Sequence, residues 1–191
     1  SKSDTDWKRR DMNYAWARGA MALAMVVALG GPLAACDRVP AATGETAAQN
    51  LRAAEFFMTS NARREGVQTL PSGVQYKVTR SDPPDGERPD RNDLVRVDYE
   101  GTLTDGTVFD SSFQSGQPAV FVVGDVVPGW TEALQQMRVG DEWVVYVPPA
   151  QGYGEAGRPG IPPNAVMVFR IKLLDIARAP GGERGGPIAQ G

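Results

Sequence analysis

The chain has 191 residues, of which 41% are hydrophobic and 23% charged, with 20 Lys and Arg against 23 Asp and Glu. This length suits one ordinary domain with appendages, and the formal charge of -3 gives no indication of nucleic-acid binding. With no histidine and one cysteine, the chain lacks the residues for a His-based triad, a His or multi-Cys zinc site, or an intrachain disulfide. No acidic cluster has ligand-like spacing, so we expect neither a metal nor another cofactor.

The N-terminal segment has the pattern of a bacterial lipoprotein signal. Basic residues from Lys8 to Arg18 precede an apolar run over residues 20–29, and about ten residues are too few to span a bilayer. The sequence Leu33-Ala34-Ala35-Cys36 then resembles a lipobox. That resemblance implies a signal over residues 1–36 and a lipid on Cys36 that anchors the protein to a membrane, on the periplasmic side of the cell envelope. The alternative is a buried free thiol, which is common for an unpaired cysteine.

The next segment predicts a linker and a short helix. Residues 37–50 are rich in Ala, Thr, Pro and Gly and lack apolar periodicity, which indicates a linker. Asn50 caps a predicted helix within residues 51–66, and one face of this helix carries Leu51, Ala54, Phe57 and Met58. One short helix offers little area against the roughly 800 Å² per partner of a standard interface. We therefore expect a monomer, with dimerisation through this helix as the alternative.

From residue 67 the pattern becomes that of short strands. Apolar and polar residues alternate over four segments, with Gln75 and Lys77 as polar positions of the first. The segments are Val74–Val78, Val95–Tyr99, Trp143–Val147 and Met167–Leu173. Asp105-Gly106 predicts a hairpin turn between two strands.

One short helix interrupts the strands. Pro128-Gly129-Trp130 opens it, Met137 lies at its end, and Gly140 stops it. Together the elements predict an α+β domain over residues 67–177, with the helix on one face of an antiparallel sheet. The Pro- and Gly-rich residues 178–191 predict a disordered tail.

Seven short motifs in one order make the chain similar to the FKBP-type peptidyl-prolyl isomerases over about residues 66–176. The motifs are Pro71–Tyr76, Val97–Gly101, Asp105–Ser112, Val127–Trp130, Gly152–Gly154, Ile161–Asn164 and Val168-Phe169. The first motif and the helix before it resemble the Mip- and FkpA-like branch of bacterial envelope proteins. The resemblance implies a half-open antiparallel sheet wrapped around one short helix, with the site between them.

The resemblance also implies the site residues and the partners. Six residues would be catalytic, namely Tyr99, Phe109, Asp110, Trp130, Tyr153 and Phe169, and three would bind substrate, namely Val126, Val127 and Ile161. The partners would be proline-containing unfolded or partly folded proteins, together with macrolides such as rapamycin.

These residue types suit catalysis of Xaa-Pro rotation. The barrier of about 18–20 kcal/mol is lost amide resonance, so neither a nucleophile nor a metal is required. A twisted amide has a less polar carbonyl, and an apolar, dry pocket favours it over the planar form. Trp130 would form the floor under the prolyl ring, while the Tyr153 hydroxyl, a backbone N–H near Val127 and Asp110 would orient the substrate.

Other interpretations remain open. Tyr99, Trp130 and Phe169 also follow the periodicity of plain core residues, and Asp110 is a turn residue in the simplest interpretation. The alternative functions are a client-binding chaperone module with little catalysis and an envelope lipoprotein with a vestigial pocket.

Three departures from the family pattern concern the pocket. Ala119 follows Pro118 where classical members carry an aromatic residue, which makes one wall smaller unless Phe121 fills it. Ser115 or Gln114 stands near the position of a basic residue that pairs with the aspartate. Arg158 replaces a histidine in a loop that is one residue shorter and overhangs the pocket, so the family pattern leaves substrate preference and macrolide affinity open.

Overall fold

The computed structural model describes residues 44–81 and 85–179 of the chain. They belong to one compact unit, Val39–Gly191. The predicted signal with Cys36, the predicted linker up to residue 43 and the tail from residue 180 lie outside the described residues.

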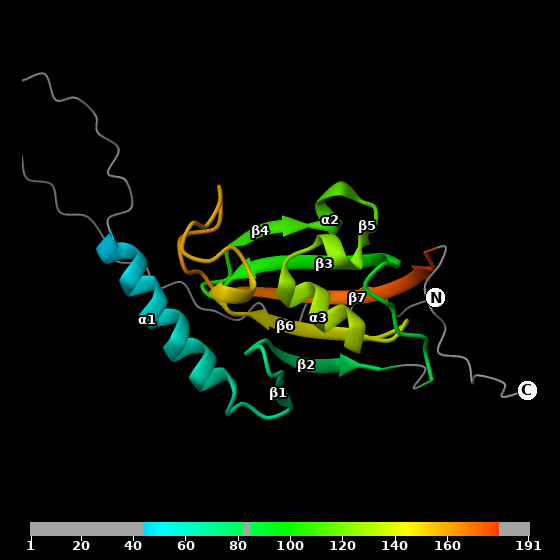
Figure 1. The fold of residues 1–191 in the computed structure, drawn as a ribbon, viewed down its shortest axis with the longest axis horizontal. Helices are drawn as coiled ribbons and strands as arrows, with labels where there is room; N and C mark the ends of the chain where they lie inside the picture. Colours follow the sequence, from blue (N-terminus) through cyan, green and yellow to red (C-terminus); the bar gives the residue numbers. More distant parts are fainter. Residues whose placement is uncertain (1–43, 82–84, 180–191) are drawn as a thin grey trace, which may run out of the picture. The chain divides into compact units, whose positions relative to one another are not determined.

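One seven-stranded antiparallel sheet dominates the described part of the chain, with strand order β1-β2-β6-β7-β3-β4 and with β5 also paired to β3 (Figure 1). The strands are β1 (Val67–Thr69), β2 (Gln75–Arg80), β3 (Leu94–Leu103), β4 (Val108–Ser111), β5 (Ala119–Val122), β6 (Glu142–Val147) and β7 (Met167–Ala177). The helices are α1 (Gly44–Asn61), α2 (Ser112–Ser115) and α3 (Pro128–Gln136), with short 3-10 turns η2 (Val123–Asp125) and η3 (Pro149–Gln151).

The long strands β3 and β7 form the centre of the sheet and carry the predicted alternation. Tyr99 pairs with Ile171, and Gly101 pairs with Phe169. The inward positions of both strands are buried, whereas Arg170 is exposed. Because successive side chains point to opposite faces, this pattern gives one apolar face to the core.

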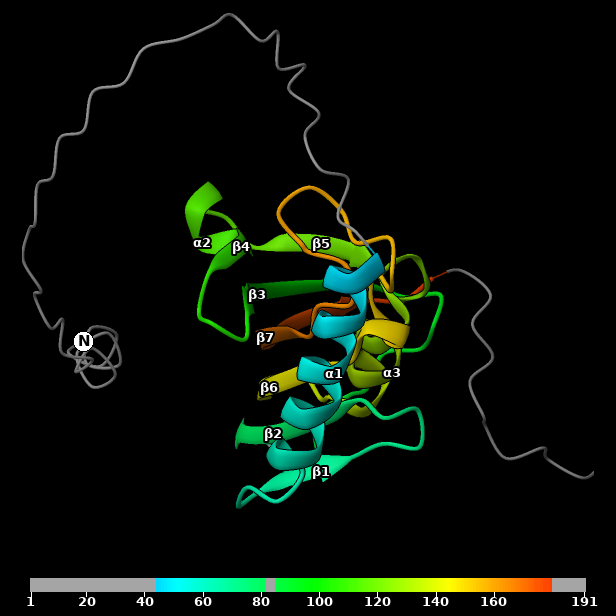
Figure 2. The ribbon, with the colours of Figure 1, turned by 90° about the vertical axis from the view of Figure 1, so that its left-hand side faces the viewer.

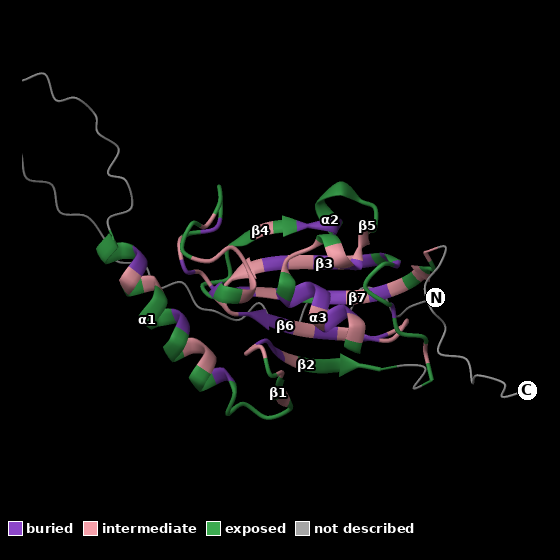
Figure 3. Ribbon diagram, viewed as in Figure 1, coloured by how far each residue is buried: buried purple, intermediate pink, exposed green. Residues whose placement is uncertain are grey.

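Helix α3 packs against that apolar face, as the position of the buried residues shows (Figure 3). Ala133 and Leu134 of α3 are fully buried. The predicted α+β fold, with an open antiparallel sheet around one short helix and a further N-terminal helix, is therefore confirmed. The predicted Asp105-Gly106 hairpin turn is present too, and Gly106 has a φ of 87°.

Helix α1 differs from the prediction in where it begins and in which face it buries. It begins at Gly44 rather than at residue 51, because the Ala-rich stretch interpreted as a linker has good helix propensity. Asn50 therefore lies inside the helix and does not cap it. Ala54 is buried as predicted, but Leu51 is 42% exposed.

Gln75 stands at a polar position of the predicted alternation, yet it is buried, with 4% of its surface exposed. The C-terminal part of α1 covers this position. The Gln75 side chain donates a hydrogen bond from Nε2 to the Met58 carbonyl and accepts one from Asn61 Nδ2 at Oε1. Because α1 packs against β2 at this position, a polar residue of the alternating pattern becomes buried.

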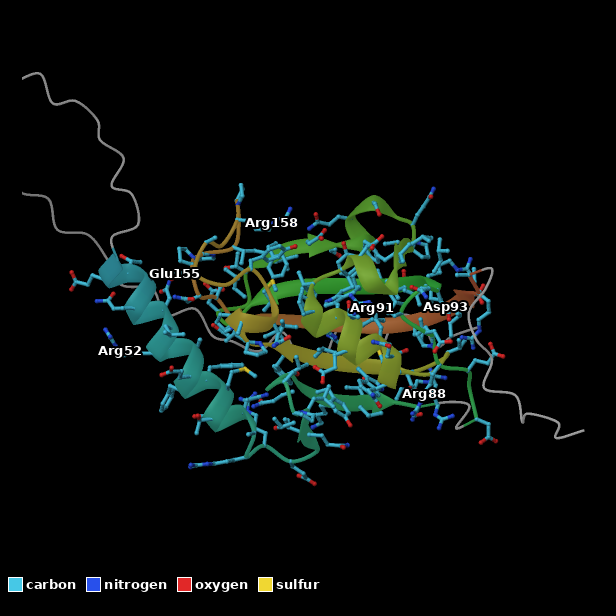
Figure 4. The ribbon with its side chains drawn as sticks, viewed as in Figure 1. Arg52, Arg88, Arg91, Asp93, Glu155 and Arg158 are labelled. Carbon is cyan, nitrogen blue, oxygen red and sulfur yellow. The ribbon has the colours of Figure 1, made fainter. Side chains whose placement is uncertain are left out.

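Arg178 and Ala179 were predicted to belong to the tail, yet both are held by the carboxylate of Asp93. Arg178 Nη1 lies 2.7 Å from Asp93 Oδ2, and the Ala179 N–H donates to Oδ1 at 3.0 Å. A buried carboxylate needs such partners to offset its desolvation. Figure 4 places Asp93 at the end of the sheet opposite to α1.

Among the helices of the described residues, none has both the length and the apolar character needed to cross a membrane.

Candidate functional site

The tryptophan of helix α3 forms the floor of a pocket between the helix and the sheet. Pro128 stands in the first turn of α3, where its fixed φ suits a helix start. The Thr131 hydroxyl donates to the Val123 carbonyl at 2.7 Å and fastens α3 to η2. A Cβ at Gly129 would lie 2.7 Å from Val147 Cγ1, so this glycine lets α3 approach β6 closely. These contacts hold Trp130 in place with only 4% of its surface exposed.

Four aromatic rings surround or extend this floor in edge-to-face contacts. The Trp130 ring centroid lies 5.2 Å from that of Tyr99, 5.1 Å from that of Phe169 and 5.6 Å from that of Phe121. Phe109 packs edge-on against Phe169 at 5.6 Å. Contacts of this kind contribute about 0.5–1.5 kcal/mol each beyond burial. The walls of the pocket are therefore already packed against one another without a ligand.

The cavity above these rings has a volume of about 630 Å³. This volume is typical of a small-ligand pocket. Its lining residues come from β3, β4, β5, the η2–α3 segment, the loop between η3 and β7, and β7. They are Tyr99, Phe109, Asp110, Phe121, Asp125, Val126, Val127, Trp130, Tyr153, Arg158, Pro159, Ile161 and Phe169.

A tyrosine–aspartate pair lies at the edge of the aromatic cluster. The Tyr99 hydroxyl donates a hydrogen bond to Asp110 Oδ2 at 2.7 Å. Burial raises the pKa of Tyr99, and the hydrogen bond to the Asp110 carboxylate raises it further. The hydrogen bond from Tyr99 fixes the direction of the exposed Asp110 side chain.

The loop between η3 and β7 overhangs the pocket and carries Tyr153, Arg158 and Ile161. Arg158 and Ile161 exchange two backbone hydrogen bonds, of 2.9 and 2.8 Å, around a tight turn at residues 159–160. Arg158 Nη1 donates to the Tyr153 hydroxyl at 2.7 Å. Because this oxygen accepts from Arg158, its own hydrogen remains available to a ligand.

A backbone donor also lines the cavity. Val127 accepts hydrogen bonds at its carbonyl from Trp130 and Thr131, as the first turn of α3 requires. Its N–H has no acceptor within the part of the chain that the structure describes. A carbonyl group of a bound ligand is a suitable acceptor for it.

All nine residues that the sequence analysis assigned to the site line this one cavity. Four further lining residues were not assigned, namely Phe121, Asp125, Arg158 and Pro159. The sequence signal for Phe121 was the small Ala119 two positions before it, and the structure pairs Phe121 with the buried Val95. Asp125 and Pro159 lie in turns, and the sequence does not indicate whether these turns face the pocket.

Two of the departures from the family pattern now have a structural counterpart. Phe121 contacts Trp130 and supplies an aromatic ring on the β5 wall near the small Ala119. Asp110 has Tyr99 as its hydrogen-bond partner, and no Lys or Arg of the described residues forms an ion pair with it. Across residues 44–81 and 85–179, no three acidic or cysteine side chains gather as metal ligands would.

Comparison with known families and proteins gives a consistent set of matches. The family described as FKBP-type peptidyl-prolyl cis-trans isomerase matches residues 85–174, and the domain amino-terminal to such isomerases matches residues 32–78. The peptidyl-prolyl cis-trans isomerase Mip of Coxiella burnetii is 46% identical over 130 residues, which are 68% of this chain and 56% of that protein. The chain spans about half the length of the curated relatives it matches.

Two solved structures are similar in both sequence and fold. FkpA from Escherichia coli superimposes with a TM-score of 0.68 at 40% identity, over 72% of this chain and 63% of that one. A peptidyl-prolyl cis-trans isomerase from Pseudomonas syringae pv. tomato has a TM-score of 0.64 at 35% identity, over 69% of this chain and 96% of that one.

Proposed function

The chain belongs to the FKBP-type peptidyl-prolyl cis-trans isomerase family, and we propose that its pocket accelerates Xaa-Pro rotation in other polypeptides. The observation that carries the proposal is the buried Trp130 ring at the floor of an open cavity, with Tyr99, Phe121 and Phe169 edge-on around it. This is a preformed apolar site for a prolyl ring.

The reaction requires no bond to be made or broken, so the pocket has to prefer the twisted amide over the planar one. The planar amide has the more polar carbonyl and loses more hydration energy in an apolar site. The rings around Trp130 supply that site, and their fixed packing means that little side-chain ordering is needed on binding. The catalysis we propose is non-covalent and needs no metal.

The polar groups of the pocket orient the substrate in this proposal. The Val127 N–H and the Tyr153 hydroxyl donate to two substrate carbonyls on opposite sides of the prolyl ring. Asp110, held by Tyr99, makes a close polar contact with the carbonyl of the rotating bond. Each such contact is worth about 0.5–1.5 kcal/mol net. The pocket would then hold a peptide in the bent path that the twisted bond needs.

The test is catalysis of a refolding reaction that is limited by proline isomerisation. The full chain, purified in a mild detergent, is compared with Asp110→Ala and Trp130→Leu, with and without rapamycin. We expect the wild type to accelerate the slow phase, rapamycin to block the acceleration, and both substitutions to reduce it about tenfold or more, as loss of about 1.4 kcal/mol of transition-state stabilisation does.

Asp110 is exposed, so Asp110→Ala leaves no cavity and removes only the hydrogen bond from Tyr99, and thermal unfolding of the variant measures that loss apart from activity. Acceleration that rapamycin does not block would still support isomerase activity. It would then attribute the weak rapamycin binding to Ala119 and Arg158, where the pocket departs from the family pattern. A folded wild type that accelerates nothing would refute the proposal and favour a client-binding module instead.

For the cellular setting we propose a lipid-anchored protein of the bacterial envelope that acts on proline-containing unfolded or partly folded clients. The support is the Leu33–Cys36 sequence after an apolar run and basic residues. A lipid on Cys36 would hold the domain near the membrane while the pocket stays accessible to clients.

A further inference from the structure

Helix α1 and the loop that follows the pocket are joined by a reciprocal pair of side-chain amides. Asn50 of α1 donates from Nδ2 to the Pro163 carbonyl at 2.8 Å. Asn164 of the loop donates from Nδ2 to the Ala47 carbonyl of α1 at 2.9 Å. We call Asn50 and Asn164 the amide clasp. Figure 2 shows the N-terminal half of α1 beside this loop, which runs from η3 to β7.

The clasp continues directly into the wall of the pocket. The Asn164 N–H donates to the Gly154 carbonyl at 2.8 Å, next to Tyr153. On its other side, Pro162 and Pro163 connect the clasp to Ile161. Tyr153 and Ile161 both line the pocket. A displacement of Asn164 would therefore move both ends of the overhanging loop.

Asn164 also has an unusual backbone. Its φ is 54°, and it is the sole non-glycine residue with positive φ in the described part of the chain. Asparagine tolerates this conformation better than most residues, yet the conformation persists only where the surroundings enforce it. Here the surroundings are the Ala47 and Gly154 carbonyls, which fix the side chain and the backbone of a residue that is 92% buried.

The seam between α1 and the loop is not closely packed. A cavity of about 230 Å³ lies along it, between Ala53 and Phe57 of α1 and Leu103, Pro162 and Val166 of the domain. Where apolar contact is incomplete, the directional amide hydrogen bonds determine where the loop sits on the helix.

We propose that Asn50 and Asn164 are positioning residues of the isomerase pocket, through which helix α1 holds the loop carrying Tyr153 and Ile161 in its substrate-binding position. The inference rests on the proposed function, since it assigns α1 a part in substrate affinity. Helix α1 then belongs to the catalytic unit rather than serving only as a spacer.

A second pair of amide contacts on the same helix provides a matched control. Asn61 Nδ2 donates to Gln75 Oε1 at 2.9 Å, and Gln75 Nε2 donates to the Met58 carbonyl at 2.8 Å. These contacts join the C-terminal end of α1 to β2, which contributes no residue to the pocket. Their loss loosens the same helix without touching the overhanging loop.

The experiment compares Asn50→Ala, Asn164→Gly and Asn164→Asp with the control Asn61→Ala, all in the full chain. Glycine retains the positive φ but removes the amide, and aspartate retains the size but removes the donor. KM and kcat are measured on a proline-containing tetrapeptide, Tm by thermal unfolding, and backbone exchange by hydrogen–deuterium exchange of the Arg158 and Ile161 amides.

We expect KM to rise about three- to tenfold in the clasp variants and kcat to change little. A rise of this size corresponds to the loss of one neutral hydrogen bond. Exchange of the Arg158 and Ile161 amides should quicken in the same variants. Asn61→Ala should lower Tm by a similar amount and change neither KM nor loop exchange.

Unchanged KM and unchanged loop exchange in Asn50→Ala and Asn164→Gly, despite a lowered Tm, would overturn the inference. So would an equal rise of KM in Asn61→Ala, because it would show a general effect of loosening α1. A wild-type protein with no activity on the peptide would refute the proposed function itself, and the positioning role with it. This outcome is distinct from the others because it is seen in the wild type and does not depend on the clasp variants.

Discussion

Gly101 lies in β3 directly against the two phenylalanine rings of the pocket. A Cβ at this position would come within 2.8 Å of both the Phe109 and the Phe169 ring. Real Cβ atoms do not approach other atoms so closely, so the rings would have to move. The absence of a side chain at residue 101 is thus a requirement of the aromatic walls.

We expect Gly101→Ala to reduce kcat/KM at least tenfold and to cost about 1–3 kcal/mol of stability through overpacking. Refolding catalysis and thermal unfolding measure the two effects. Gly44→Ala is the matched control, because no atom lies within 4 Å of the added Cβ. Normal activity of Gly101→Ala would show that the rings can shift without harm to the pocket.

The Tyr99 hydroxyl contributes to stability in a pH-dependent way. Burial and the bond to Asp110 raise its pKa above the ordinary value of 10.0. A raised folded-state pKa means that the contribution is complete below the unfolded-state pKa and is lost as pH rises above it. We expect Tyr99→Phe to cost about 0.5–1.5 kcal/mol at pH 7 and progressively less above about pH 10.

Denaturant unfolding between pH 7 and 11 measures this change. Tyr146→Phe is the control, since Tyr146 is also buried but its hydroxyl has no hydrogen-bond partner in the described part of the chain. An equal loss in both variants at every pH would contradict the assignment to the Asp110 hydrogen bond.

At the scale of elements, Asp93 ties the segment before β3 to the end of β7. Its carboxylate accepts from the Asp90 N–H at 2.7 Å, as well as from Arg178 and Ala179. Burial acts to raise the pKa of Asp93, but the hydrogen bonds from Asp90, Ala179 and Arg178 outweigh it and lower the pKa below 3.8. The group therefore stabilises the fold above its unfolded-state pKa, and this stabilisation is lost as pH falls through the folded-state pKa.

We expect Asp93→Asn to lower the free energy of unfolding at pH 7 by about 1.5–3 kcal/mol, the range for hydrogen bonds to a charged group. The difference from wild type should shrink below about pH 4. Urea unfolding from pH 2 to 7 is the measurement. Asp175→Asn, which removes an exposed partner 3.7 Å from Arg96, should have little effect. A constant difference at all pH values would contradict the role of the carboxylate charge.

Some elements could be predicted from the sequence and others could not. Strands β3 and β7 were predictable because each buries one face, and the period of two then appears directly in Val95, Val97 and Tyr99. The start of α1 was not, because an Ala-rich, Thr-containing stretch has neither an apolar stripe nor a cap. The burial of Gln75 was not visible in the alternation of β2, because the residues that cover it, Met58 and Asn61, belong to a separate element, helix α1.

At the scale of the whole molecule, the membrane attachment that we propose would depend on Cys36, which lies outside the described residues. We expect a radiolabelled or clickable fatty acid to be incorporated into the wild-type protein in a bacterial host and not into Cys36→Ser. The Cys36→Ser protein should retain the apolar run of residues 20–29, since processing at the lipobox needs the cysteine. Labelling of the serine variant, or no labelling of the wild type, would refute the lipid anchor.

The sequence by itself determined the fold class, the hairpin turn, α3 and nine residues that line the pocket. Strand alternation and turn residues are local properties of the chain, and the nine pocket residues followed from the resemblance of seven motifs to the isomerase family. The tertiary structure alone decided that Asp125 and Pro159 complete the pocket, and which carboxylate holds Arg178. It also decided that Asn50 and Asn164, 114 positions apart, join α1 to the pocket loop. Contacts between distant residues depend on the direction in which loops and helices pack, and that direction leaves no periodic signal in the chain.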